Sequence, residues 1–247
     1  MTTITQKDLF EELAERGWRT ETITKLDGST ASIKVPLTSA EFVHPQEGYH
    51  LPNSTFHDSA VGDAKDMLTR RYASDPETAV FRDLLIKWDI ANLDDHSPDV
   101  YVVFGVRNKE QNRTQFVVAE EGVCPSLIIE VVSPRYRKED REIKVKEYAQ
   151  AKVQEYVIVD RRTQRGQVIE EVLGYRLVDG QYLPLTPDDD GRILSETVGL
   201  WIGLYDGRVV MEDAQTGKRL LTSRELDQRA ARLAELLRTQ GIDPDQV

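Results

Sequence analysis

The stretch that decides the fold is residues 126–134, which read SLIIEVVSP, followed after a charged segment by residues 155–160, which read EYVIVD. Both runs are apolar and rich in β-branched residues, which is typical of strands that are covered on both faces of a sheet. Residues 138–151 between them have a helical pattern. A strand, a helix and a strand in this order predict a right-handed crossover between two parallel strands.

Glu130 places a carboxylate inside the first of these runs. Side chains alternate along a strand, so Glu130 shares one face with Ile128 and Val132. A buried carboxylate is costly unless it is paired or binds a metal. A second acid, Asp99, opens another predicted strand over 100–106. If Glu130 were considered alone, a hydrogen bond to an arginine or to a backbone amide would explain its burial. Only the residues around it favour a catalytic role.

The helical segment places a lysine one turn from an acid and one turn from an aromatic residue. Asp140, Lys144 and Tyr148 are spaced by four, so their side chains lie on one stripe of the helix. Tyr148 favours burial of this stripe, and Lys146 is displaced by about 200° around the helix. Two carboxylates beside a lysine are typical of a magnesium-dependent phosphodiester hydrolase. The alternative is that Asp140 and Lys144 form only a weak surface ion pair.

Composition limits the class of protein. The chain has 247 residues and a formal net charge of −11, which is long enough for one sizeable core and too acidic for a generic nucleic-acid coat. No apolar run approaches the length of a membrane span, and no signal peptide is evident. The single Cys124 excludes an internal disulfide and cysteine-based zinc sites. We therefore expect a cytoplasmic protein that does not enter a membrane.

Outside the central segment, the pattern predicts further elements in a defined order. They are a helix over 5–17, an irregular to extended segment over 18–52, a helix over 56–72 capped by Asn53 or Ser54, a strand over 80–90, a β-hairpin over 166–185, strands over 197–205 and 208–211, and a helix over 222–240. The last helix has a capping box, Thr222 and Glu225, and an apolar stripe that includes Leu226, Leu233 and Leu237. We expect it to project from the core and to support a homodimer.

Taken in order, these pieces resemble the Uma-two family of endonucleases, within the PD-(D/E)XK restriction-endonuclease-like superfamily. The matching pieces are Pro98-Asp99-Val100, residues 127–134 with Glu130, then Asp140, Lys144 and Tyr148, residues 155–160, and a C-terminal tail at 237–244. The resemblance covers about residues 40–205 and this tail. It implies an α/β fold with a mixed central β-sheet flanked by α-helices, and a C-terminal helix. The expected division is an N-terminal helix and extended segment (1–35), a nuclease domain (36–212) and a C-terminal charged helix (213–247).

The resemblance also implies roles for the central residues. Asp99 and Glu130 would hold a divalent cation, Mg²⁺ or Mn²⁺, with the backbone carbonyl of Val131 as a further ligand. Lys144 would orient the attacking water or stabilise the charge that develops on the phosphate. The chain would then be a metal-dependent endonuclease that hydrolyses phosphodiester bonds of nucleic acid, with DNA as the expected substrate. The two carboxylates should lie close enough to share one cation, with the Lys144 ammonium in the same cleft.

One position departs from the superfamily pattern. The usual lysine lies two residues after the second acid, where this chain has Val132, so the lysine role passes to Lys144 on the helix. The same departure keeps a second interpretation open, in which the chain is a catalytically silent relative that binds nucleic acid or protein. A small-molecule hydrolase is a weaker third interpretation, because the sequence has no nucleotide loop and no nucleophile elbow.

Several accessory residues follow from the same comparison. Glu47 and His57 are possible further ligands or bases, beside Asp140 and Tyr148, although a surface glutamate in a loop and a capping or partly buried histidine are the more common situations. A basic cluster of four residues lies between the Glu130 strand and the Lys144 helix and could contact phosphates, or could be ordinary surface charge. Its members are Arg135, Arg137, Lys138 and Arg141. The other three histidines, His44, His50 and His96, show no ligand spacing.

Overall fold

The centre of the molecule is a six-stranded sheet with the strand order β10-β9-β8-β7-β5-β3. The computed structural model describes residues 6–52 and 54–244. The strands are β3 (Thr78–Phe81), β5 (Val100–Phe104), β7 (Leu127–Val131), β8 (Glu155–Gln164), β9 (Gln167–Val178) and β10 (Gln181–Pro184). β7 and β8 pair in parallel, and the other neighbours pair antiparallel. This mixed sheet confirms the predicted fold class and the parallel pair around the crossover.

The crossover between β7 and β8 is not the single α-helix expected over 138–151. It consists of a 3-10 turn (Pro134–Tyr136), a π-helical segment (Glu139–Ile143) and α5 (Lys144–Gln150). The Lys144 amide donates to the Glu139 carbonyl, five residues back. Such widened turns are rare and are frequent at functional sites. Here the widened turn immediately precedes the helix that carries the candidate lysine.

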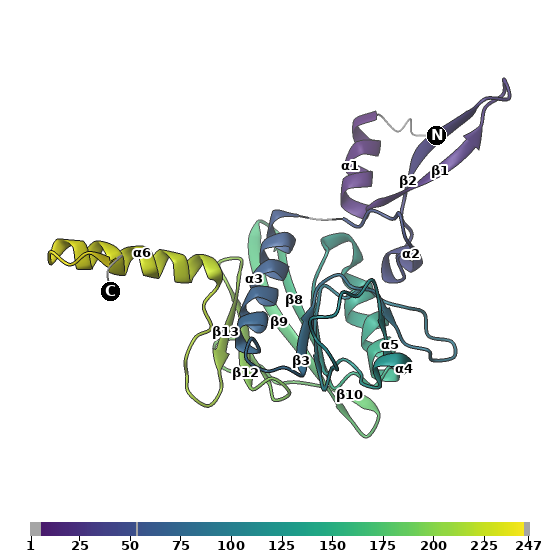
Figure 1. The fold of residues 1–247 in the computed structure, drawn as a ribbon. Coiled ribbons are helices and arrows are strands. Elements are labelled where there is room, and N and C mark those ends of the chain that lie inside the picture. Colours follow the sequence, from purple (N-terminus) through teal and green to yellow (C-terminus); the bar gives the residue numbers. More distant parts are fainter. Residues whose placement is uncertain (1–5, 53, 245–247) are drawn as a thin grey trace.

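Helices cover the sheet on both faces, with α3 (Thr55–Arg71) on one side and α5 on the other (Figure 1). Along β7, Leu127, Ile129 and Val131 pack in the core beneath α3. Ile128 and Val132 belong to the second core, with Tyr148 of α5. The alternation predicted for this strand is therefore confirmed. β7 is buried on both faces, which explains why its sequence is almost wholly apolar.

The start of α3 is held by a cap. The Ser54 hydroxyl accepts a hydrogen bond from the His57 amide at 3.1 Å, as expected of an N-cap serine. Asn53, the other predicted cap, lies outside the described residues. The cap sets His57 on the first turn of α3, next to the central strands.

Smaller elements complete the body. They are the parallel pair β4 (Ile86–Lys87) and β6 (Phe116–Val117), the short helix α4 (Val118–Glu121), and a three-stranded sheet of β11 (Ile193–Ser195), β12 (Leu200–Tyr205) and β13 (Arg208–Asp213). The predicted strand over 80–90 is wrong as a single element. Its apolar alternation is divided between β3 and β4, because the chain turns between them at Asp83, where φ is 51°.

The N-terminal part is more regular than predicted. α1 (Gln6–Arg16) is followed by a β-hairpin of β1 (Trp18–Thr24) and β2 (Thr30–Pro36), and then by α2 (Ser39–Val43). The segment over 18–52, expected to be irregular to extended, is extended in its first half, where it forms a hairpin that was not predicted. The hairpin strands are largely exposed and so lack the apolar alternation that reveals a strand with a buried face. α1 and the hairpin project from the body (Figure 1).

The N-terminal part is attached tightly at Gly17. This glycine has φ of 73°, and a Cβ there would lie 2.3 Å from the His50 carbonyl oxygen. Trp18 and His50 exchange two backbone hydrogen bonds of 2.8 Å each. The close approach requires glycine, and it joins the root of the hairpin to the segment 42–52 that precedes α3.

The C-terminal helix α6 (Ser223–Thr239) extends away from the body as a separate rod (Figure 1). Its predicted capping box is present, since Thr222 and Glu225 cap each other reciprocally. Among the described helices, none has the length and apolar character needed to cross a membrane. The cytoplasmic location and the three-part division of the chain stay predictions.

Candidate active site

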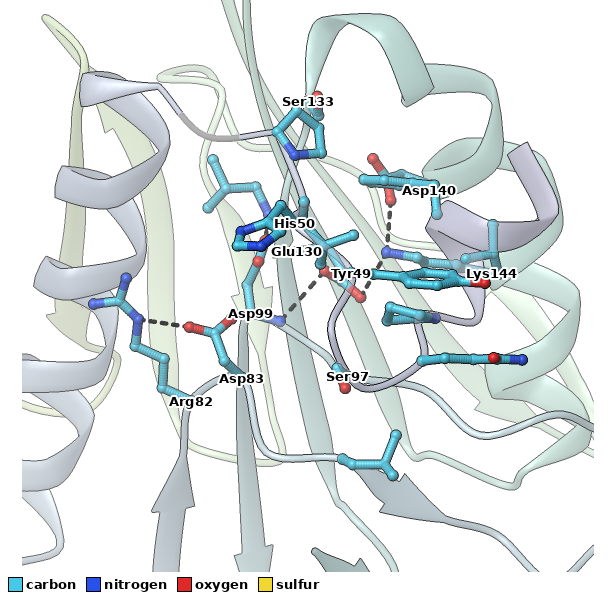
Figure 2. A pocket seen from close by; sticks show the side chains of 18 of the residues that line it. Tyr49, His50, Arg82, Asp83, Ser97, Asp99, Glu130, Ser133, Asp140 and Lys144 are labelled. Atoms are coloured by element: carbon cyan, nitrogen blue, oxygen red, sulfur yellow. Dashed lines mark hydrogen bonds and ion pairs between the residues drawn. The ribbon is translucent and has the colours of Figure 1, made fainter. Parts of the chain in front are cut away.

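A cavity of about 790 Å³ opens where β7 ends and β5 begins. Asp99 and Glu130 lie at its floor, and Lys144 comes from α5 (Figure 2). His57, on α3, also lines it. Residues 42, 43 and 45–52, at the end of α2 and in the connection from α2 to α3, form a wall of the same cavity. We call this cavity the cleft. It brings together residues that the sequence singled out on β7, α5 and α3 and at the start of β5.

The sheet places the two acids side by side. β5 and β7 are antiparallel, with Val100 opposite Ile129, so the next pair in this register is Asp99 and Glu130. The Val131 amide donates to Asp99 Oδ2 at 2.7 Å, and the Asp99 amide faces Glu130 Oε2 at 3.4 Å. Both carboxylates therefore lie at one edge of the sheet and line the same cleft.

Lys144 points into the cleft, and its side chain is only 8% exposed. Its ammonium is 3.0 Å from Glu130 Oε1 and 2.9 Å from Asp140 Oδ1. The Tyr148 hydroxyl also donates to Glu130 Oε1, at 2.7 Å. Lys146, two residues further along the helix, is exposed. Of the two helix lysines, Lys144 is thus the one that can act on a group bound in the cleft.

Burial dominates the electrostatics of this group. It raises the pKa of Glu130 to about 8, although the Lys144 ammonium opposes the shift. Burial likewise raises the pKa of Asp140. The pKa of Asp99 is lowered, because the His57 hydrogen bond and the Lys144 charge outweigh burial. Burial opposes the rise in the pKa of Lys144, which is driven by the carboxylates around it. If all three acids ionised, one ammonium would leave a negative excess, which a bound cation would offset.

Of the two accessory candidates, the structure brings His57 to the acids and leaves Glu47 at the rim. His57 Nε2 is 3.2 Å from Asp99. Asp99 raises the pKa of His57 against the effect of burial. Its Nδ1 is buried and has no hydrogen-bond partner among the described residues. Glu47 lines the cleft as an exposed residue of the wall.

The usual lysine position is filled by an apolar side chain. Val132 is 2% exposed and packs in the core beside Tyr148. A lysine at this position would project into that core rather than toward a solvated group. The Lys144 ammonium reaches Glu130 from the neighbouring helix instead. The Val131 amide is bonded to Asp99, and a ligand role for its carbonyl stays a prediction.

The basic cluster divides into two halves. Arg137 and Arg141, together with Arg162 of β8, form ion pairs with the two carboxylates Asp160 and Glu171. Three guanidiniums therefore share two carboxylates, which leaves one positive charge. The other two members, Arg135 and Lys138, are exposed, and neither has an ion-pair partner within the described part of the chain. None of the four lines the cleft, and Arg137 lines a neighbouring cavity of about 590 Å³.

Sequence reasoning missed two features near the cleft. Asp83, in the turn after β3, adds another carboxylate to its lining. His44, His96 and Glu147 have potential ligand atoms within 4.8 Å of one another. These three residues come from separate segments, so no spacing in the sequence could have revealed the group. The positive φ at Asp83 is likewise invisible in a pattern of apolar residues.

Comparisons with known proteins found a family model and solved structures that are similar to the chain. The Uma2 family model, described as "Putative restriction endonuclease", matches residues 50–205. Among solved structures, the chain is similar to a "putative nuclease" from Anabaena variabilis, with 14% identity and a TM-score of 0.45, over 66% of this chain and 91% of that one. No curated protein matches the chain. The matched range includes Asp99, Glu130 and Lys144.

Proposed function

The chain belongs to the Uma2 family of restriction-endonuclease-like proteins, and on this basis we propose that it is a metal-dependent endonuclease that hydrolyses phosphodiester bonds of DNA. The observation that carries the proposal is the convergence of Asp99, Glu130 and Lys144 in one cleft. We assign metal binding to the two acids and charge stabilisation to the lysine. Asp140 and Tyr148 hold the lysine and the glutamate in place.

The donor set fits a hard divalent cation. Asp99 and Glu130 offer carboxylate oxygens, which Mg²⁺ and Mn²⁺ prefer. Glu130 Oε1 is already engaged by Lys144 and Tyr148, whereas Oε2 faces Asp99 with only one long contact, of 3.4 Å. The weakly bonded Oε2 is therefore the oxygen most available to a cation shared with Asp99. The Val131 carbonyl is the proposed third protein ligand.

The residues of the chain supply the remaining chemistry. When bound, the cation neutralises phosphate charge and lowers the pKa of a coordinated water. The Lys144 ammonium is held between Glu130 and Asp140, ready to stabilise charge on the phosphate oxygens without reorganising. His57 Nε2 contacts Asp99 and orients that carboxylate. Because Glu130, Asp140 and Lys144 are buried, the interactions among them act in a medium that screens them weakly.

The function is tested by incubating the pure chain with duplex DNA, single-stranded DNA and RNA. We expect cleavage of DNA with Mg²⁺ or Mn²⁺ and none in excess chelator. Calorimetry with Mn²⁺ tests metal binding separately from cleavage. If the chain binds nucleic acid but cuts none of these substrates with either metal, the silent relative suggested by Val132 becomes the better interpretation.

We propose that nucleic acid approaches the cleft over the unpaired half of the basic cluster. Each phosphate contact contributes about −0.9 to the slope of log K against log salt for duplex DNA. Replacing Arg135 or Lys138 with alanine should remove about one phosphate contact each and make the slope less steep by that amount. Binding should weaken equally for all DNA sequences. Fluorescence anisotropy at several salt concentrations measures this change.

The matched comparison uses the paired half of the cluster. Arg141→Ala would remove an ion-pair partner from the buried Asp160. It should therefore lower the stability of the protein to urea, so its effect should not be confined to the salt slope. An unchanged slope in the double variant of Arg135 and Lys138 would contradict the proposed path.

We also propose that α6 supports a homodimer. Its apolar stripe is uncovered, with Leu226 36% and Leu233 53% exposed and no residue of the helix buried. A helix with this pattern buries its stripe against a partner. Sedimentation at micromolar concentration should give a dimer that becomes a monomer when residues 222–247 are deleted. A full-length chain that sediments as a monomer would contradict this prediction.

A further inference from the structure

A second group of titratable side chains lies behind the wall of the cleft. His44 is the last, capping residue of α2, His96 precedes β5, and Glu147 belongs to α5. Their ligand atoms all lie within 4.8 Å of one another, and none of the three lines the cleft. Two histidines and a glutamate at such distances suggest either a metal site or a proton-dependent contact, and the hydrogen bonds decide between them.

The hydrogen bonds of His96 disfavour a metal. The Trp88 indole can only donate, and its Nε1–H donates to His96 Nδ1 at 2.9 Å. The ring proton of neutral His96 therefore lies on Nε2, where it is donated to Glu147 Oε2 at 2.9 Å. Burial lowers the pKa of His96, which favours this neutral form. A metal would need the lone pair of Nε2, and that nitrogen already carries the proton.

His44 has the opposite arrangement. Its Nδ1 lies 3.1 Å from the Asp95 carbonyl oxygen, which can only accept, so Nδ1 carries a proton. Its Nε2 faces Glu147 Oε1 at 3.4 Å and Asp94 Oδ2 at 4.0 Å. A neutral ring would direct a lone pair at the Glu147 carboxylate, whereas a charged ring donates a hydrogen bond to it. The contact between His44 and Glu147 is therefore favourable only when His44 is protonated.

This contact anchors one end of a lightly held stretch of the cleft wall. Residues 45–49 begin directly after the histidine, and their other end is fixed where His50 pairs with Trp18. Among the described residues, one backbone hydrogen bond lies inside the stretch, from the Tyr49 amide to the Gln46 carbonyl at 3.1 Å. Residues 46–48 are exposed. The position of this stretch thus depends on its two ends.

We propose that His44 is a protonation-dependent latch that, when charged, fastens residues 45–49 of the cleft wall to α5, the helix that carries Lys144. The neutral ring releases them. This function is additional to the proposed nuclease activity and does not depend on what the cleft binds. Both histidines contact Glu147. It accepts one hydrogen bond from neutral His96 at all times, and a second from His44 only when the His44 ring is charged.

The direction of the pH dependence follows from the groups that face His44. Glu147 of α5 raises the pKa of His44, and Asp94 adds to this effect against burial. His96 faces it as a neutral ring, and Asp95 presents only its carbonyl. The pKa of Glu147 is lowered to about 2, because the two histidines outweigh burial. Above the raised pKa of His44 the latch should be open. As pH falls through that pKa the latch should close, and it should stay closed at lower pH until Glu147 is protonated.

The test combines two measurements on the full chain, and neither needs enzymatic activity. Histidine Cε1–Hε1 signals are titrated by NMR, and amide exchange of residues 45–49 is followed across the same pH range. We expect His44 to titrate above the usual ~6.5. After correction for intrinsic rates, exchange should slow on the order of tenfold as the charged hydrogen bond forms.

Two variants in the crossover sharpen the test. Glu147→Gln keeps an acceptor for His96 and removes the charge that favours charged His44, so it should bring the His44 midpoint to or below ~6.5 and abolish the pH dependence of exchange. The matched control, Glu142→Gln, changes an exposed glutamate of the preceding turn and should change neither measurement. A His44 midpoint that does not respond to Glu147→Gln would overturn the proposal. Protection of residues 45–49 by equimolar Zn²⁺ at high pH would overturn it in favour of a metal site.

Discussion

Glu130→Gln and Asp99→Asn should each reduce cleavage to the background rate, a loss of more than about 10³-fold. A bound metal stabilises the transition state by several kcal/mol, and about 1.4 kcal/mol corresponds to a factor of ten. The amide variants keep the size of each side chain and remove the charge that holds the cation. Plasmid nicking measures the rate, and Mn²⁺ calorimetry should show that binding is lost in parallel.

Two further measurements keep this prediction independent of folding. Glu130 is buried and bonded to Lys144 and Tyr148, and truncation to alanine would leave the lysine with fewer partners, at a cost of about 3–5 kcal/mol for a broken buried pair. Glu130→Gln keeps the volume of the side chain and so leaves no cavity, and circular dichroism checks that the variant is folded. Glu142→Gln serves as the exposed control. A Glu130→Gln chain that still cleaves with metal at the wild-type rate would remove Glu130 from the site.

Lys144→Ala should lower the rate of cleavage by about 10²–10³-fold and leave Mn²⁺ binding largely intact. This is the usual loss when one preorganised charge-stabilising group is removed. The ammonium touches Glu130 and Asp140 inside the cleft, whereas Lys146 is exposed on another face of the helix. Single-turnover rates at saturating metal separate the effect on the chemical step from any effect on binding.

Lys146→Ala is the matched control for this prediction, because it removes the same side chain two residues away and should change the rate little. Full activity in Lys144→Ala together with a large loss in Lys146→Ala would show that the choice of lysine is wrong. Because Lys144→Ala also leaves Asp140 and Glu130 without their shared cation, its urea unfolding should be measured beside its rate.

Much of the fold was predictable because its centre is strongly patterned. β7 is apolar at every position except Glu130, and a strand of this kind must be covered on both faces. The spacing of four between Asp140, Lys144 and Tyr148 placed them on one stripe, and all three meet Glu130 or its partners. This held although Asp140 lies in a π-helical segment rather than in an α-helix. The exposed hairpin of β1 and β2 was missed because its strands have no buried face to leave an alternation.

The central strands, the crossover between them and the candidate site residues could be predicted from the chain's local patterns, because burial and helical spacing are local. Which distant side chains meet followed only from the folded structure. It paired Arg137 and Arg141 with Asp160 and Glu171, and it gathered the second histidine group around Glu147. Such contacts join segments tens of residues apart, and they depend on the packing of whole elements, which no spacing along the chain encodes.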